Sequence, residues 1–218
     1  MSETLGKFIA DIMTLENHMG SITSPQMAFI MTFFSEHPEL NTILETGFHK
    51  GLSSALFLDQ RPEIRVVSFD IFWFDYTRKA KLFLDKHYPD RHLLLAGNSV
   101  TSLPTFFKFH PEFVPDFVFI DGGHERPVPY MDIYQVLSNI KENTWVMIDD
   151  YCKAHGEGGV NEAVDYAIKL GLLKNVQVFA AADRGWITAQ RSEVPMPPCI
   201  LNDEQRLQLL QDVLSHYA

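Results

Sequence analysis

Short apolar runs alternate along the chain with longer stretches in which apolar and polar residues recur at helical spacing. The runs that we expect to form strands cover residues 42–44, 66–69, 92–95, 117–120, 145–148, 176–179 and 186–189. Most are β-branched or aliphatic, and each is followed by a turn, as is typical of strands buried on both faces of a sheet. The pattern therefore predicts a sheet whose strands are mostly parallel.

The segments between these runs predict helices. Ser24 and Pro25 place a capping residue before a first-turn proline, and the helix that they begin runs through Phe34. Further helices are expected over 53–58, 76–87, 131–140 and 161–170. Alternating strands and helices predict a Rossmann-like, doubly wound α/β fold, with seven strands and helices on both faces. The last two runs are too close for a crossover helix, so we expect a C-terminal antiparallel hairpin.

We expect one domain over the whole chain, 1–218. Residues 1–21 are predicted to form an N-terminal helical extension, 22–190 the core, and 191–218 a proline-containing linker with a terminal helix. Phe29, Phe33 and Phe34 form an apolar stripe on the first core helix. Packing on the sheet explains this stripe, and so does pairing with a second copy in a homodimer.

Charge and cysteine content narrow the possible partners and the compartment. The chain has 18 Lys and Arg against 28 Asp and Glu, a formal net charge of −10. Proteins that bind nucleic acids or anionic membranes usually carry a basic face, so we expect neither partner. No run approaches the roughly 18 apolar residues of a membrane span. The two cysteines, Cys152 and Cys199, form no CxxC pair, and the start lacks a signal-peptide pattern, so a cytoplasmic protein is expected.

Polar residues and glycines gather directly after the predicted strands. Ligands of an open parallel sheet bind beyond the carboxyl ends of its strands, so these residues outline the predicted site. They are Glu45, Gly47, Gly51 and Ser53 after the first run, Asp70 after the second, Asn98 and Ser99 after the third, Asp121 to His124 after the fourth, and Asp149 and Asp150 after the fifth.

The turn after the first run indicates the class of cofactor. Gly47 permits a sharp turn, and the helix that follows offers free N–H groups to a carboxylate or phosphate. Asp70 lies 23 residues later, where a carboxylate can accept hydrogen bonds from ribose hydroxyls. The GxGxxG dinucleotide fingerprint would place a glycine where this chain has Glu45, whose charge would repel a pyrophosphate. The turn therefore favours S-adenosylmethionine, a cationic nucleoside without phosphate.

These motifs resemble those of the class I S-adenosylmethionine-dependent methyltransferases, over about residues 22–190. The segments Ile-Asp-Gly-Gly-His at 120–124 and Ile-Asp-Asp-Tyr at 148–151 narrow the resemblance to Mg²⁺-dependent small-molecule O-methyltransferases related to catechol O-methyltransferase and to the macrolide-sugar O-methyltransferases. The resemblance implies that the cofactor is bound by Glu45, Gly47, Gly51, Ser53, Asp70, Ser99 and Asp121.

The same resemblance implies a metal and a base. Asp121, Asp149 and Asp150 would hold Mg²⁺ or another divalent cation, and His124 would take a proton from a small hydroxylated acceptor, with Asp121 as the second catalytic residue. Three carboxylates in a partly dry cleft repel one another unless they are protonated or bridged by a cation, which agrees with a metal site. A single Asp here would be explained better as a helix cap or a solvated side chain, and only the three together favour a metal.

Several alternatives stay open. His155, on a glycine-rich loop, is a second candidate for the base. Phe72, Trp73 and Phe74 follow Asp70, and either stacking on the adenine or core packing explains them. A non-catalytic protein that binds S-adenosylmethionine would retain the same pocket. A nicotinamide-dependent reductase is the other alternative, and Glu45 argues against it.

Overall fold

The computed structural model describes residues 2–13, 22–72, 74–152, 159–180 and 184–198. In these ranges one seven-stranded sheet has the order β3-β2-β1-β4-β5-β7-β6. The strands are β1 (Thr42–Thr46), β2 (Arg65–Asp70), β3 (His92–Ala96), β4 (Phe117–Ile120), β5 (Trp145–Ile148), β6 (Leu173–Ala180) and β7 (Gly185–Arg191). β1 to β5 pair in parallel, whereas β7 is antiparallel to both β5 and β6. The predicted sheet and its C-terminal hairpin are confirmed.

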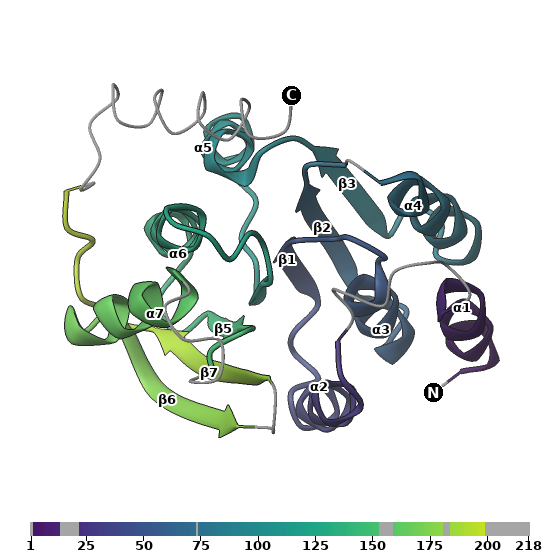
Figure 1. The fold of residues 1–218 in the computed structure, drawn as a ribbon, viewed down its shortest axis with the longest axis horizontal. Coiled ribbons are helices and arrows are strands. Elements are labelled where there is room, and N and C mark those ends of the chain that lie inside the picture. The colour runs from purple at the N-terminus through teal and green to yellow at the C-terminus, as the bar shows by residue number, and fades with distance from the viewer. Residues whose placement is uncertain (1, 14–21, 73, 153–158, 181–183, 199–218) are drawn as a thin grey trace.

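Helices cover both faces of the sheet (Figure 1). One layer holds α1 (Glu3–Met13), α2 (Ser24–Glu36), α3 (Leu52–Gln60) and α4 (Asp75–His87), and the other holds α5 (Ser99–Phe109), α6 (Val128–Asn139) and α7 (Gly159–Lys169). Side chains alternate between the two cores along each strand. In β4, Phe117 and Phe119 face the first layer, whereas Val118 and Ile120 face the second.

Two helices differ from the prediction. Residues 99–109 were not predicted as a helix, and Pro104 inside them argues against one. α5 forms because the Asn98 side chain accepts a hydrogen bond from the Val100 N–H at 3.0 Å, and because one face of the helix is buried. α2 is capped by Thr23 rather than by Ser24.

The aromatic stripe of α2 packs within the chain. Phe33 and Phe34 are buried in the core, and the ring of Phe29 lies 4.6 Å from that of Phe179 and 5.8 Å from that of Trp186. The homodimer stays a prediction. The predicted terminal helix lies outside the described residues. Among the helices that the structure does describe, none has both the length and the apolar character needed to cross a bilayer.

The topology decides where a ligand can bind. The chain builds β1, β2 and β3 outward in one direction and then returns to place β4 and β5 on the other side of β1. At this reversal the loops after β1 and β4 leave the sheet in opposite directions and open a crevice at its carboxyl edge. The residues singled out by the sequence lie at this edge: Glu45 is inside β1, Asp70 is the last residue of β2, and the others follow β1, β3, β4 and β5.

Candidate active site

The glycine turn after β1 is pressed against the end of β4. Gly47 has a φ of +86°, and a Cβ atom built there would lie 1.8 Å from the backbone oxygen of Asp121. The Gly47 N–H donates to the Phe69 carbonyl at 2.8 Å, which ties the turn to β2 as well. Only glycine combines this conformation with this approach. The turn therefore joins the ends of three strands into one site.

Asp70, at the end of β2, holds two loops in place. One carboxylate oxygen accepts a hydrogen bond from the His49 N–H and the other from the Phe72 N–H, both at 2.7 Å. His49 and Phe72 have positive φ values of 47° and 62°. The Asp70 carboxylate thus stabilises two unfavourable backbone conformations. Each of its oxygens has a further lone pair, so the predicted contact with a ribose is compatible with these bonds.

Glu45 and Ser53 lie beneath the turn rather than on its outer surface. The Glu45 carboxylate is completely buried and accepts hydrogen bonds from the hydroxyls of Ser53, Ser54 and Ser68, the last at 2.6 Å. Burial raises the pKa of Glu45, and the three serine hydroxyls oppose that rise. The carboxylate therefore supports the turn from inside, and its contact with a cofactor stays a prediction.

Asp132 on α6 was not singled out by the sequence. It is 1% exposed, and a Cβ on Gly122 would lie 2.5 Å from its Oδ2, so the carboxyl group packs against the loop after β4. Burial raises the pKa of Asp132 to about 7, and the nearby hydroxyls of Ser99 and Thr46 oppose the rise. Ser99, one of the predicted cofactor contacts, thus also faces this buried acid. The signal in the sequence that could have identified Asp132 is an acidic residue among the mostly apolar buried positions of α6.

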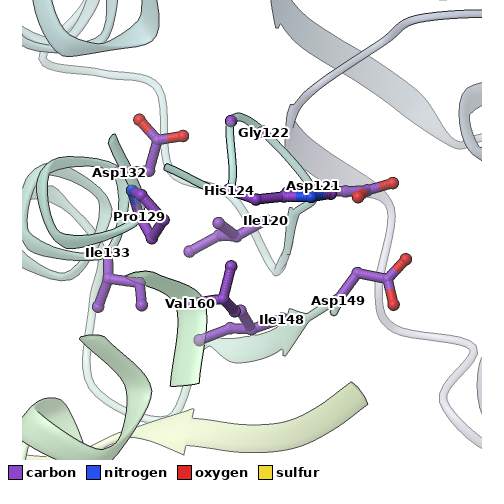
Figure 2. Close-up of a pocket in the computed structure, with 11 residues that line it drawn as sticks. Ile120, Asp121, Gly122, His124, Pro129, Asp132, Ile133, Ile148, Asp149 and Val160 are labelled. Carbon is purple, nitrogen blue, oxygen red and sulfur yellow. The ribbon is translucent and has the colours of Figure 1, made fainter. Parts of the chain in front are cut away.

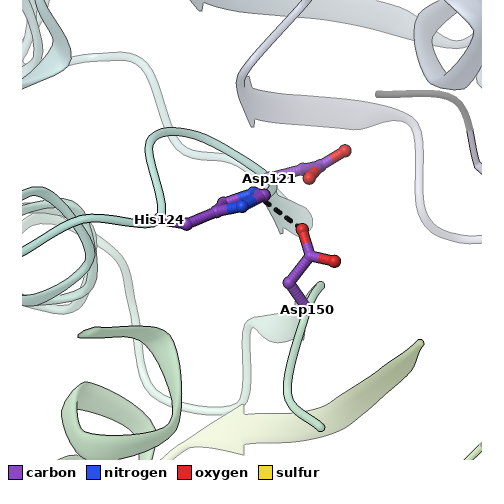
Figure 3. Close-up of side chains that lie close together, drawn as sticks. All are labelled: Asp121, His124 and Asp150. Atoms are coloured by element: carbon purple, nitrogen blue, oxygen red, sulfur yellow. Dashed lines mark ion pairs between the residues drawn. The ribbon is translucent and has the colours of Figure 1, made fainter. Parts of the chain in front are cut away.

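Asp121, His124 and Asp150 come together at the ends of β4 and β5 (Figure 3). One nitrogen or oxygen from each lies within 4.8 Å of the others. His124 Nε2 is 2.7 Å from Asp150 Oδ2, and this hydrogen bond raises the pKa of the imidazole. Burial, followed by the charges of Asp149 and Asp150, raises the pKa of Asp121 well above its usual range.

A residue of α2, in the N-terminal part of the chain, fixes the orientation of the Asp149 side chain. Its Oδ1 accepts hydrogen bonds from Gln26 Nε2 at 2.5 Å and from the Asp150 N–H at 2.8 Å. Its Oδ2 is buried and has no hydrogen-bond partner among the described residues. Burial and the charge of Asp150 raise the pKa of Asp149 to about 6. Gln26 carries no motif in the sequence, since its partner lies 123 residues away.

A small pocket lies behind this acidic edge (Figure 2). Its walls are Ile120, Ile133, Ile148 and Val160, together with the loop that carries Asp121 and His124. In the close-up, the carboxylates of Asp121 and Asp149 lie on the same side and point away from these apolar walls. The apolar side chains thus back the acidic groups and limit their contact with water.

The donor set fits a divalent cation. Asp121, Asp149 and Asp150 offer hard oxygen ligands. Among the described residues, the potential ligand atoms that lie within 4.8 Å of one another come from Asp121, His124 and Asp150, and Asp149 is not part of this group. The buried Oδ2 of Asp149 lacks a partner within the described part of the chain. A cation would relieve the mutual repulsion that raises the pKa values of Asp121 and Asp149. The assignment of these three ligands stays a prediction. Arg184, which the sequence did not single out, also reaches this cluster and lies 3.2 Å from Asp150 Oδ1. His155 and Trp73 lie outside the described residues.

The strand order, the glycine turn after β1 and the acid at the end of β2 are together those of a class I methyltransferase. Residues 44–151 match the family model of a methyltransferase domain. This range includes the glycine turn, Asp70 and the three aspartates of the acidic cluster. The match assigns a methyltransferase domain to this range, in agreement with the resemblance to the class I, S-adenosylmethionine-dependent methyltransferases. No curated protein sequence matches it.

Solved methyltransferase structures share the fold. A SAH-bound methyltransferase from Podospora anserina is 15% identical, with a TM-score of 0.71 over 88% of this chain and 89% of its own. An O-methyltransferase from Bacillus cereus, in complex with SAH, is 14% identical, with a TM-score of 0.69 over 88% and 92%. An O-methyltransferase of tomaymycin synthesis from Streptomyces achromogenes, in complex with SAM, is 18% identical, with a TM-score of 0.67 over 88% and 91%.

Proposed function

We propose that the protein transfers the methyl group of S-adenosylmethionine to a hydroxyl group of a small molecule. The observation that carries this proposal is the contact between Gly47 and the Asp121 carbonyl. It joins the glycine turn after β1, which we call the cofactor turn, to the acidic cluster of Asp121, Asp149 and Asp150. A cofactor held in the turn would present its methyl group beside His124 and the aspartates. The O-methyltransferases from B. cereus and S. achromogenes, which share the fold, support this reaction class.

The cofactor would lie across the carboxyl ends of β1, β2 and β3. Asp70 would accept hydrogen bonds from the ribose hydroxyls, and Ser99 would contact the adenine. Gly47 and Gly51 would let the methionine part approach the backbone, with Glu45 and Ser53 supporting the turn from beneath. Asp121 would contact both the cofactor and the acceptor. This arrangement would hold the acceptor oxygen in line with the sulfonium methyl group, which is the main contribution of such a site.

His124 is proposed as the general base. Its Nε2 faces the Asp150 carboxylate, so the favoured neutral tautomer carries its proton on Nε2 and leaves the Nδ1 lone pair to accept a proton. As the bond from the acceptor oxygen to the methyl carbon forms and the bond from sulfur to that carbon breaks, the hydroxyl proton passes to Nδ1. Asp150 stabilises the imidazolium that results, in agreement with the raised pKa of His124.

Asp121, Asp149 and Asp150 are proposed to hold Mg²⁺ or another divalent cation. When bound, the cation would lower the pKa of the acceptor hydroxyl and make it a better nucleophile. Gln26 fixes the orientation of Asp149, so this residue of α2 would tie the N-terminal part of the chain to the site. The predicted partner is a small hydroxylated molecule, and we expect the protein to act in the cytoplasm.

The test combines binding and turnover. We expect SAH to bind in calorimetry and NADH not to bind, and labelled methyl groups to pass to at least one member of a panel of catechols and sugars in the presence of Mg²⁺. His124→Ala should lower turnover about 10²–10⁴-fold with unchanged SAH affinity. His110→Ala is the matched control, because that imidazole is 52% exposed and contacts Glu112 and the ring of Phe106 rather than the site.

Each negative result has a separate meaning. Binding of SAH without transfer to any acceptor would favour a non-catalytic cofactor-binding protein. Full activity after chelation would remove the cation from the mechanism and leave the base and the positioning of the acceptor. Full activity of His124→Ala would reject His124 as the base.

A further inference from the structure

Each carboxylate oxygen of Asp150 has a nitrogen partner, and one of the two partners is a guanidinium. Arg184, which directly precedes β7, brings its Nε to 3.2 Å from Asp150 Oδ1. His124 Nε2 lies 2.7 Å from the other oxygen, Asp150 Oδ2. The side chain of Asp150 is only 7% exposed and that of Arg184 is 21% exposed, so water screens the pair weakly. A carboxylate that is expected to bind a cation is therefore already in contact with a guanidinium of the same chain.

The backbone fixes this contact. A Cβ atom on Gly185 would lie 2.3 Å from the Tyr151 carbonyl oxygen and 3.0 Å from the Phe179 carbonyl oxygen. Only a glycine lets β7 begin this close to the loop after β5, and this approach places Arg184 beside Asp150. Asp150 itself has a φ of +57°, a conformation that non-glycine residues rarely adopt. Backbone features on both sides of the ion pair thus hold it in place.

The charge of Arg184 also acts beyond Asp150. The guanidinium lowers the pKa values of Asp121 and Asp149, against the larger effects that raise them. It therefore offsets part of the repulsion among the three aspartates, which is the role that a bound cation would otherwise fill. A divalent cation at this cluster would meet the field of a positive charge fixed next to one of its ligands.

We propose that Arg184 is the resident counter-ion of the acidic cluster, and that it competes with a divalent cation for Asp150 and so sets the cation affinity of the site. This inference rests on the cation binding of the proposed function. A cation on Asp150 Oδ1 requires Arg184 to release or to share that oxygen. A cation on Asp150 Oδ2 is still repelled by the neighbouring guanidinium charge, so both modes of binding are weakened. Loss of the guanidinium should therefore tighten cation binding by at least about 10-fold, because like charges separated by a few ångströms in a poorly screened site repel strongly.

Mn²⁺ binding to the full chain tests this directly, measured by electron paramagnetic resonance without acceptor or turnover. Arg184→Gln removes the charge and should bind Mn²⁺ at least about 10-fold more tightly than the wild type. Arg184→Lys keeps the charge and should stay within about 3-fold of the wild type. Lys174→Gln is the matched control, because this cation of β6 pairs with Glu193 away from the cluster. SAH affinity, measured in parallel, reports whether each variant retains its fold.

The outcomes separate this inference from the proposed function. Unchanged or weaker Mn²⁺ binding by Arg184→Gln, with measurable binding by the wild type, would overturn the role of Arg184 and leave the cation site standing. An absence of binding by both proteins would overturn the role of Arg184 and the cation site together, while methyl transfer is judged separately by the labelling assay. Binding by Arg184→Gln alone would support the competition. Should Arg184→Gln fail to fold, Arg184→Met gives the same comparison with a neutral side chain of similar length.

Discussion

Replacement of Gly47 by alanine should damage the fold and the site together. The added Cβ atom would lie 1.8 Å from the Asp121 carbonyl oxygen, so either the turn or the end of β4 has to move. The φ of +86° adds the cost of a left-handed conformation, about 1–2 kcal/mol for a non-glycine residue. Overpacking costs about 1–3 kcal/mol more. We therefore expect Gly47→Ala to lower the free energy of unfolding by about 2–5 kcal/mol, out of a typical total of 5–15 kcal/mol.

The movement should also separate the cofactor turn from the acidic cluster. Displacement of the turn or of the Asp121 backbone disturbs two predicted cofactor contacts, so SAH affinity should fall by at least about 10-fold in the variant that still folds. Urea denaturation measures the stability, and calorimetry with SAH measures the affinity. Gly6→Ala is the matched control, because nothing lies within 4 Å of a Cβ at Gly6 in α1. That substitution should stabilise the helix by about 0.5–1 kcal/mol.

One result would refute this reasoning. If Gly47→Ala unfolds within about 0.5 kcal/mol of the wild type and binds SAH equally well, the turn does not pack against the Asp121 carbonyl as described. The link between the cofactor turn and the acidic cluster would then be lost, and with it the observation that carries the proposed function.

Three further predictions follow from individual side chains. Asp70→Ala removes the acceptor of two backbone N–H groups and should weaken SAH binding by about 1–3 kcal/mol in calorimetry, and unchanged affinity would reject the ribose contact. Gln26→Ala should lower the free energy of unfolding in urea by about 1–3 kcal/mol, because the buried Asp149 Oδ1 loses a hydrogen bond, and wild-type stability would contradict this role. Asp132 has a native pKa of about 7 against an ordinary value of 3.8, so between pH 5 and 7 the native state keeps a proton that the unfolded chain has released. The free energy of unfolding of the wild type should therefore fall by about 3 kcal/mol from pH 5 to pH 8, relative to that of Asp132→Asn. Urea denaturation at a series of pH values measures both proteins, and parallel pH profiles would exclude a raised pKa.

The elements and the edge of the sheet that carries the site could be predicted from the sequence. All seven strands lie where short apolar runs occur. In the inner strands the reason is that a strand buried on both faces needs apolar residues on both, whereas the edge strands β3 and β6 are only partly buried. Gly47, Asp70 and the aspartates after β4 and β5 lie at strand ends, because the buried bodies of these strands favour apolar residues. Glu45 lies inside β1 nevertheless, where three serine hydroxyls donate to its carboxylate. α5 was missed because its interior proline weakens the local signal, whereas the buried face that stabilises the helix depends on the rest of the fold.

The sequence by itself thus determined the fold class, the glycine turn after β1 and the acidic edge of this protein. These features follow from local patterns of apolar and polar residues and from the rule that ligands of an open parallel sheet bind at the carboxyl ends of its strands. Only the tertiary structure decided which groups surround each acid. Gln26 reaches Asp149 across 123 residues, and Arg184 reaches Asp150 because Gly185 lets two loops pass closely. Hydrogen bonds and ion pairs of this kind depend on distances of a few ångströms between segments far apart in the chain, and neither residue type nor spacing encodes such distances.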